Sequence, residues 1–101
     1  MSSPQKDMDR QAYIDLMEAQ LKEWKAEIDM LRAKAEKTDA QTRIEYQDQI
    51  ESLSKKRQAL SQKVQDLRSS GSDAWHDMRD GIEKARSELQ AALKNAGSRF
   101  R

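Results

Sequence analysis

The stretch between Pro4 and Gly71 contains no glycine and no second proline, and this absence constrains the fold more than any other feature of the chain. Proline breaks a helix and glycine weakens it, whereas the Ala, Glu, Lys, Gln, Arg, Leu and Met that dominate here lose little side-chain freedom on forming one. The sequence therefore predicts a long helix over about residues 9–68, on the order of 90 Å at 1.5 Å per residue. Its continuity is open only through 36–44.

Apolar side chains recur along this helix at alternating steps of three and four, which is the heptad pattern of a coiled coil. The first group, here called the N-terminal seam, comprises Ile14, Met17, Leu21, Trp24, Ile28 and Leu31. A second group follows a weak region at Thr38 and Thr42, and comprises Tyr46, Ile50, Leu53, Leu60, Val64 and Leu67. Two consecutive steps of four, from Thr42 to Tyr46 to Ile50, predict a stutter that unwinds the supercoil locally.

A turn at residues 69–72 ends this helix and starts a shorter one over about 73–98. Gly71 is expected to adopt the left-handed conformation beyond the helix C-terminus, and Ser72 is expected to cap the next helix. The apolar seam of the shorter helix includes Trp75, Met78, Ile82, Leu89, Leu93 and Phe100. Because short connections favour antiparallel neighbours, the predicted fold is all-α, an antiparallel helical hairpin with coiled-coil packing. Residues 1–8 are expected to be a disordered leader, and 9–100 a single domain.

The unequal lengths of the two helices predict a partner. Folded back from the turn, the shorter helix reaches about 40 Å at 1.5 Å per residue and covers the long helix only back to about Thr42. The six large side chains of the N-terminal seam are then left bare, which forfeits on the order of 10 kcal/mol of burial. We therefore expect self-association through this seam, most economically as a two-fold dimer, with an unidentified protein partner as the alternative.

Charge and composition argue against several classes of function. The 19 basic and 18 acidic residues are finely mixed, so no basic face attracts nucleic acid. With one histidine and no cysteine, no metal-ligating cluster is expected, and a two-helix hairpin offers no cleft that could tune catalytic groups or hold a cofactor. There is no apolar run of the roughly 20 residues that span a membrane, and no secretory signal. A non-enzymatic cytoplasmic protein is the expectation.

The shorter helix supports a second interpretation. Over residues 73–101 its apolar seam is accompanied by basic side chains, namely Arg79, Lys84, Arg86, Lys94, Arg99 and Arg101. Amphipathic helices of this composition lie on anionic membrane surfaces. A peripheral membrane protein that uses this helix is therefore the alternative function.

Several short patterns resemble a known family. They are Leu21-Lys22-Glu23-Trp24, Ile44-Glu45-Tyr46, Ala74-Trp75, Gly81-Ile82-Glu83-Lys84-Ala85, Glu88-Leu89, Ala92, Ala96 and Ser98-Arg99-Phe100. Together they resemble small bacterial coiled-coil proteins of cyanobacteria and proteobacteria that are associated with stress responses. The resemblance implies a structural or protein-interaction module with no catalytic residues to carry over.

Overall fold

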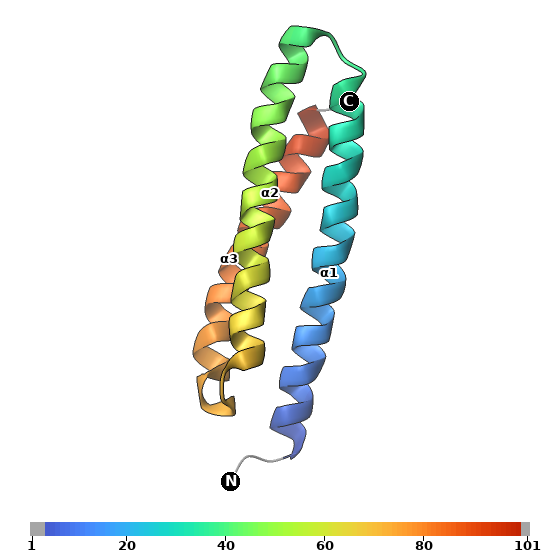
Figure 1. The fold of residues 1–101 in the computed structure, drawn as a ribbon. Coiled ribbons are helices and arrows are strands. Elements are labelled where there is room, and N and C mark those ends of the chain that lie inside the picture. Colours follow the sequence, from blue (N-terminus) through green and yellow to red (C-terminus); the bar gives the residue numbers. More distant parts are fainter. Residues whose placement is uncertain (1–3, 100–101) are drawn as a thin grey trace.

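The computed structural model describes residues 4–99, which form three long helices (Figure 1). Helix α1 spans Pro4–Glu36, α2 spans Ala40–Ser69 and α3 spans Trp75–Arg99, with a short 3-10 helix, η1, at Ser72–Ala74. No strand occurs among these residues. The all-helical class predicted from composition is confirmed, and the chain measures 59 × 19 × 17 Å along its principal axes.

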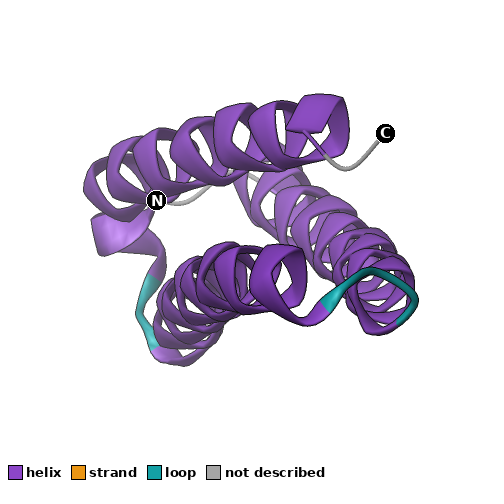
Figure 2. Ribbon diagram, turned by 90° about the horizontal axis from the view of Figure 1, so that it is seen from above, coloured by secondary structure: helices purple, strands orange, loops and turns teal. Residues whose placement is uncertain are grey.

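The three helices run up, down and up along one bundle (Figure 1). Helix α2 is the central element, since both α1 and α3 pack mainly against it and only little against each other. Seen along the bundle, α3 is inclined to the other two helices (Figure 2). It begins beside the end of α2 and leads toward the C-terminal half of α1.

The expected long helix is interrupted, so the two-helix prediction is wrong at residues 37–39. Asp39 has extended backbone angles, φ −64° and ψ 164°, and its side chain accepts a hydrogen bond of 2.8 Å from the Thr42 backbone N–H. The Thr38 hydroxyl donates to the Ala35 carbonyl at 2.8 Å. Threonine and aspartate side chains offer the backbone alternatives to helical bonds, and here they form a tight turn without glycine or proline.

The start of α1 also differs from the expectation. The chain is helical from Pro4, so residues 4–8 of the expected leader belong to α1, and residues 1–3 lie outside the described part. Proline is well suited to a first helical turn because its fixed φ is helical and its missing N–H has no helical partner there.

The second turn lies where it was predicted but is built differently. No glycine of the described chain has positive φ, so the left-handed conformation expected at Gly71 is wrong. Instead Ser70 ends α2 in an extended conformation, and its backbone N–H and hydroxyl donate to the Leu67 carbonyl at 3.2 and 2.7 Å. The Ser72 side chain, expected to be a cap, is not among those described.

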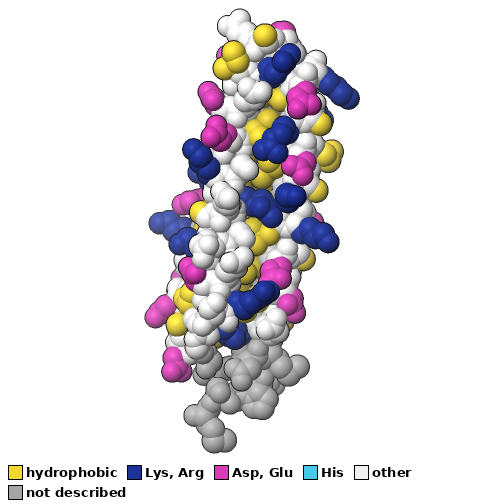
Figure 3. All heavy atoms as spheres, in the orientation of Figure 1, with side chains coloured by type: hydrophobic (Ala, Val, Ile, Leu, Met, Phe, Trp, Pro, Cys, Tyr) yellow, Lys and Arg dark blue, Asp and Glu magenta, His cyan; other side chains and the backbone are white. Residues whose placement is uncertain are grey.

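One apolar core runs through the bundle and takes residues from all three helices. On α1 it contains the N-terminal seam and Ala35, on α2 Ile50, Leu53, Leu60, Val64 and Leu67, and on α3 Trp75, Ile82, Leu89, Leu93 and Ala96. On the face drawn in Figure 3, both acidic and basic side chains lie on each side of the apolar seam between α1 and α2. This mixed surface matches the charge pattern of the sequence.

Candidate functional site

The N-terminal seam is not a bare surface. Ile14, Met17, Leu21, Trp24, Ile28 and Leu31 are each at most 8% exposed within a single chain. The interruption at residues 37–39 folds α1 back on α2, so the chain covers its own seam. The expectation of an uncovered seam is therefore wrong, and with it the physical reason for assigning these six residues to an oligomer interface. The oligomeric state itself stays a prediction.

The predicted packing residues of the second seam and of α3 lie in or beside the same core. Ile50, Leu53, Leu60, Val64, Leu67, Trp75, Ile82, Leu89 and Leu93 are buried. Tyr46 and Met78 are partly buried and pack against them. Phe100 lies outside the described residues. The structure thus brings the three predicted groups together in one core, instead of separating an interface from a hairpin.

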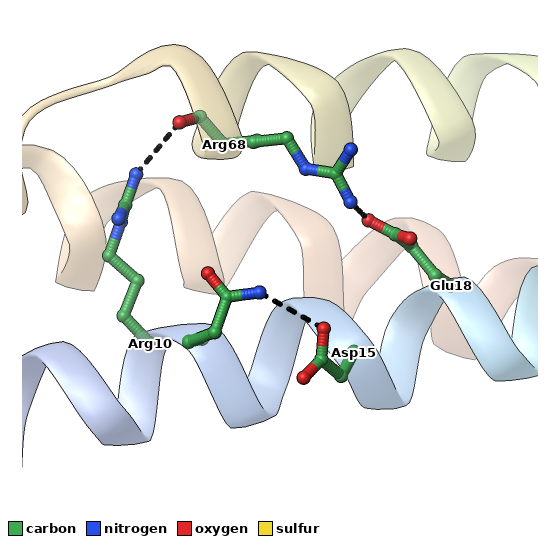
Figure 4. A network of polar contacts seen from close by, with 5 residues as sticks. Arg10, Asp15, Glu18 and Arg68 are labelled. Atoms are coloured by element: carbon green, nitrogen blue, oxygen red, sulfur yellow. Dashed lines mark hydrogen bonds and ion pairs between the residues drawn. The ribbon is translucent and has the colours of Figure 1, made fainter.

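A side chain that the sequence patterns did not predict, Arg10, caps the C-terminus of α2. Its Nη2 atom donates to three carbonyls, those of Leu67 at 2.7 Å, Arg68 at 3.0 Å and Ser70 at 2.8 Å. Figure 4 shows Arg10 reaching from α1 to the backbone of Arg68. The last carbonyls of a helix lack partners and carry partial negative charge, so a guanidinium there is stabilising. Arg10 therefore fixes α1 to the point where α2 ends.

Replacing Arg10 by alanine is expected to lower the free energy of unfolding by about 1–2 kcal/mol, because hydrogen bonds from a charged donor are lost at a partly exposed site. Arg10→Lys should recover only part of this loss, since an ammonium cannot reproduce the planar guanidinium. Urea denaturation of the three proteins checks the prediction. Equal stability of Arg10→Ala and the unchanged protein would contradict it.

Two further arginines join α1 to α2 farther along the bundle. Arg57 occupies an apolar position of the second heptad seam, and its Nε donates to the Leu21 carbonyl at 2.9 Å. Arg68 forms an ion pair with Glu18, drawn in Figure 4. A polar group in a seam commonly fixes register, and these two contacts define how α1 and α2 are aligned.

Where α1 meets α3, aromatic and charged side chains form a small cluster. The Tyr13 ring lies edge-on to the Trp75 ring, with the two ring centroids 5.2 Å apart. The Tyr13 hydroxyl donates to Glu83 Oε1 at 2.9 Å. Arg86 Nε donates to the other Glu83 oxygen at 2.7 Å, and the Arg79 guanidinium lies 5.4 Å from the Trp75 ring centre. This cluster attaches the start of α3 to α1.

The cluster perturbs two of its titratable groups. Burial, followed by the hydrogen bond to Glu83, raises the pKa of Tyr13 above its usual value. The hydrogen bond from Arg86 is the main cause that lowers the pKa of Glu83. With these pKa shifts Tyr13 stays protonated and Glu83 stays ionised near neutral pH, so the tyrosine hydroxyl remains the donor and the carboxylate the acceptor. The cluster is thus suited to holding helices together.

Farther along, a groove of about 490 Å³ lies between the C-terminal halves of α1 and α3. Its apolar lining comes from Trp24, Met30 and Leu31 on α1 and from Leu93 on α3, and Gly97 lies at its α3 side. Met30 is 61% exposed. Met30 therefore supplies most of the apolar surface that the groove exposes, since Trp24, Leu31 and Leu93 are at most 8% exposed.

The edges of this groove are polar, with two lysines and one glutamate. Glu27 and Lys34 line it from α1, and Gln90 and Lys94 line it from α3. An apolar floor with polar edges is the usual composition of a groove that accepts an amphipathic helix. The arrangement is therefore suited to binding a helix. The heptad pattern could not reveal the groove, since Trp24, Leu31 and Leu93 appear there only as seam positions and Met30 lies off the seam.

Other classes of site find less support in the described part of the chain. Among the side chains that the structure describes, those of 9–71 and 73–98, no cluster of three or more potential ligands could hold a metal ion. Among residues 4–99 no helix combines the length and the apolarity that crossing a membrane requires. The apolar residues of α3 that could contact a membrane surface, such as Ile82 and Leu89, are buried in the bundle. Membrane contact through them would require α3 to undock.

Comparisons with protein-family models, with curated proteins and with solved structures found no match to the chain. The resemblance to stress-associated coiled-coil proteins therefore stays a prediction.

Proposed function

We propose that the chain is a protein-interaction module that binds an amphipathic helix of another protein in the groove between α1 and α3. The observation that carries the proposal is this groove, with its apolar lining and the exposed Met30 side chain. A stress-associated role would fit such a module, but it rests on the resemblance of short sequence patterns alone.

The groove favours a partner of particular chemistry. Trp24 and Leu31 are seven residues apart on α1, so the floor extends over about two helical turns, or about 10 Å. A partner helix would fill it with apolar residues spaced at i, i+3 or i+4, and i+7. Lys34 and Lys94 outnumber the single Glu27 at the edges, which favours acidic residues beside the partner's apolar stripe.

Photo-crosslinking tests the proposal at defined positions. A photoreactive phenylalanine analogue at Met30 is expected to give protein adducts in cells of the source organism. The same analogue at Ile44, which is also 61% exposed but lies on α2, is the matched control and should give few adducts. Equal adducts at the two positions, or none at Met30, would contradict a partner in the groove. Adducts with lipid at Met30 would favour the membrane interpretation instead.

Two glycines of α3 offer a second control. A Cβ built at Gly97 or at Gly81 meets no atom within 4 Å, so a side chain can begin at either position without a clash at its first atom. Gly97→Leu would fill the groove and is expected to reduce the Met30 adducts at least fivefold. Gly81→Leu lies outside the groove and should leave them unchanged. Similar effects of both substitutions would show that the adducts do not depend on the groove.

A further inference from the structure

The turn between α1 and α2 is short and is held by local hydrogen bonds, among them the backbone bonds from Thr38 to Ala35 and from Arg43 to Asp39. Only residues 37–39 separate the helices, and the turn is visible at the near end of the bundle in Figure 2. Besides the Asp39 and Thr38 hydrogen bonds described above, Arg43 Nη2 donates to the Thr38 carbonyl at 3.3 Å. The turn contains no glycine, no proline and no positive φ. Each of its residues can therefore also adopt a helical conformation.

A straightened turn would keep the apolar faces of α1 and α2 on one side of a single helix. Ala35, the last core residue of α1, and Tyr46, the first residue of α2 that packs on the core, are eleven residues apart. Eleven residues make close to three full turns of an α-helix, so the two faces stay in phase. The pattern that predicted one continuous helix is thus present in the sequence. The single chain with its turn at 37–39 in place, here called the closed chain, interrupts that helix.

We propose that the turn at 37–39 can straighten and that two copies of the chain then exchange their α1 helices in a two-fold dimer. In this arrangement α1 of one copy packs on α2 and α3 of the other, and the two continuous helices over 4–69 run antiparallel. Exchange of identical elements is a low-cost route to dimers, because it reproduces the contacts of the closed chain.

The contacts between α1 and α2 are compatible with exchange, because each joins elements on opposite sides of the turn. They include the bonds from Arg10 to the α2 terminus, from Arg57 to Leu21, and between Arg68 and Glu18. All could form between two chains as they do within one. The interaction groove would also persist, now lined by α1 of one copy and α3 of the other. The dimer is therefore independent of the function proposed above.

Substitutions at the turn shift the equilibrium in opposite directions. Ala40 is the first residue of α2, and Asp39 before it already has the extended conformation that a following proline requires. Ala40→Pro therefore fits the closed chain but prevents a continuous helix. Thr38→Ala combined with Asp39→Ala removes the side-chain bonds of the turn and adds two strong helix formers, so it favours the open form.

The experiment compares the dimerisation constants of the three full-length proteins after refolding over a range of concentrations. The double alanine variant is expected to dimerise at least tenfold more strongly than the unchanged chain, and Ala40→Pro at least tenfold more weakly. The dimer should be elongated, about 100 Å long at 1.5 Å per residue. Its radius of gyration in small-angle scattering should be nearly twice the 16.4 Å of the closed chain.

Crosslinking separates exchange from side-by-side association. The chain has no cysteine, so Glu18→Cys and Arg68→Cys can be introduced singly into the double alanine variant. The two variants are then refolded together. A short bismaleimide should join a Glu18→Cys chain to an Arg68→Cys chain, because positions 18 and 68 of two different chains meet only when the copies have exchanged their α1 helices. A dimer without this crosslink would overturn the proposal, as would a double alanine variant that stays monomeric. A dimer that Ala40→Pro forms as readily as the unchanged chain would overturn it as well.

Discussion

Replacing Ile28 by alanine is expected to lower the free energy of unfolding by about 2–5 kcal/mol, the range found when a buried isoleucine or leucine is truncated. Ile28 is 2% exposed and lies in the middle of the N-terminal seam, between turns whose side chains are also buried. Little room exists for the core to collapse around the lost atoms. Because these contacts lie within one chain, the loss should be the same at low and at high protein concentration.

Urea denaturation at low micromolar and at tenfold higher concentration measures this effect. Leu16→Ala is the matched control, because Leu16 is on the same helix but 54% exposed, and its truncation should change stability by less than about 0.5 kcal/mol. A seam covered only by a second copy would behave differently. The stability of the unchanged chain would then rise with concentration, and the Ile28→Ala variant would differ from it little at high dilution.

Most of the core could be predicted from the sequence, because helical periodicity identifies which face of each helix is apolar. Leu21, Leu60 and Leu89 were assigned to seams in this way, and all three are buried. Periodicity says nothing about which face covers which, however. The N-terminal seam was expected to face a second copy, although the chain folds back and covers it with its own α2. The partner of a seam depends on the path of the chain.

The chain reverses direction at residues 37–39, where the local sequence signals for helix and for turn are weak and conflicting. Lysine, threonine and aspartate are tolerated within helices, and the apolar phase continues across them, so continuity was a reasonable expectation. Two contributions to the free energy decide the outcome. The apolar burial gained when α1 and α2 pack together stabilises the interrupted form, and the few helical hydrogen bonds lost at the turn oppose it. The Asp39 cap then lowers the cost of interruption, and hydrogen bonds from Thr42 hold the pKa of that carboxyl below its usual range.

The polar contacts between helices could not be predicted at all. Arg10 is one arginine among many charged residues. Its acceptor, the Leu67 carbonyl at the end of α2, is 57 positions away along the sequence, and only folding brings the two together. Tyr13 and Glu83 are likewise 70 positions apart. Neither pair has a spacing that local rules recognise. Both lie at the end of the bundle where α2 leads into α3, so they join the same region.

The largest effect at that end is expected for Trp75→Ala, with a loss of about 3–5 kcal/mol in the free energy of unfolding. Trp75 begins α3, is 6% exposed and contacts both the Tyr13 ring and the Arg79 guanidinium. Since small domains have only about 5–15 kcal/mol to lose, the variant should be marginal. Trp75→Phe keeps an aromatic ring against Tyr13 and should retain most of the stability.

Hydrogen exchange shows whether Trp75→Ala destabilises α3 alone or the whole bundle. Because Trp75 and the hydrogen bond between Tyr13 and Glu83 attach the start of α3 to α1, the first turns of α3 should exchange fastest in the variant. The α1–α2 contacts around Arg57 should stay protected longer, since they do not involve α3. Uniformly faster exchange in all three helices would mean that α3 docks cooperatively with the rest. In that case α3 could not open alone, and a membrane-bound α3 on an otherwise folded chain would be excluded on energetic grounds.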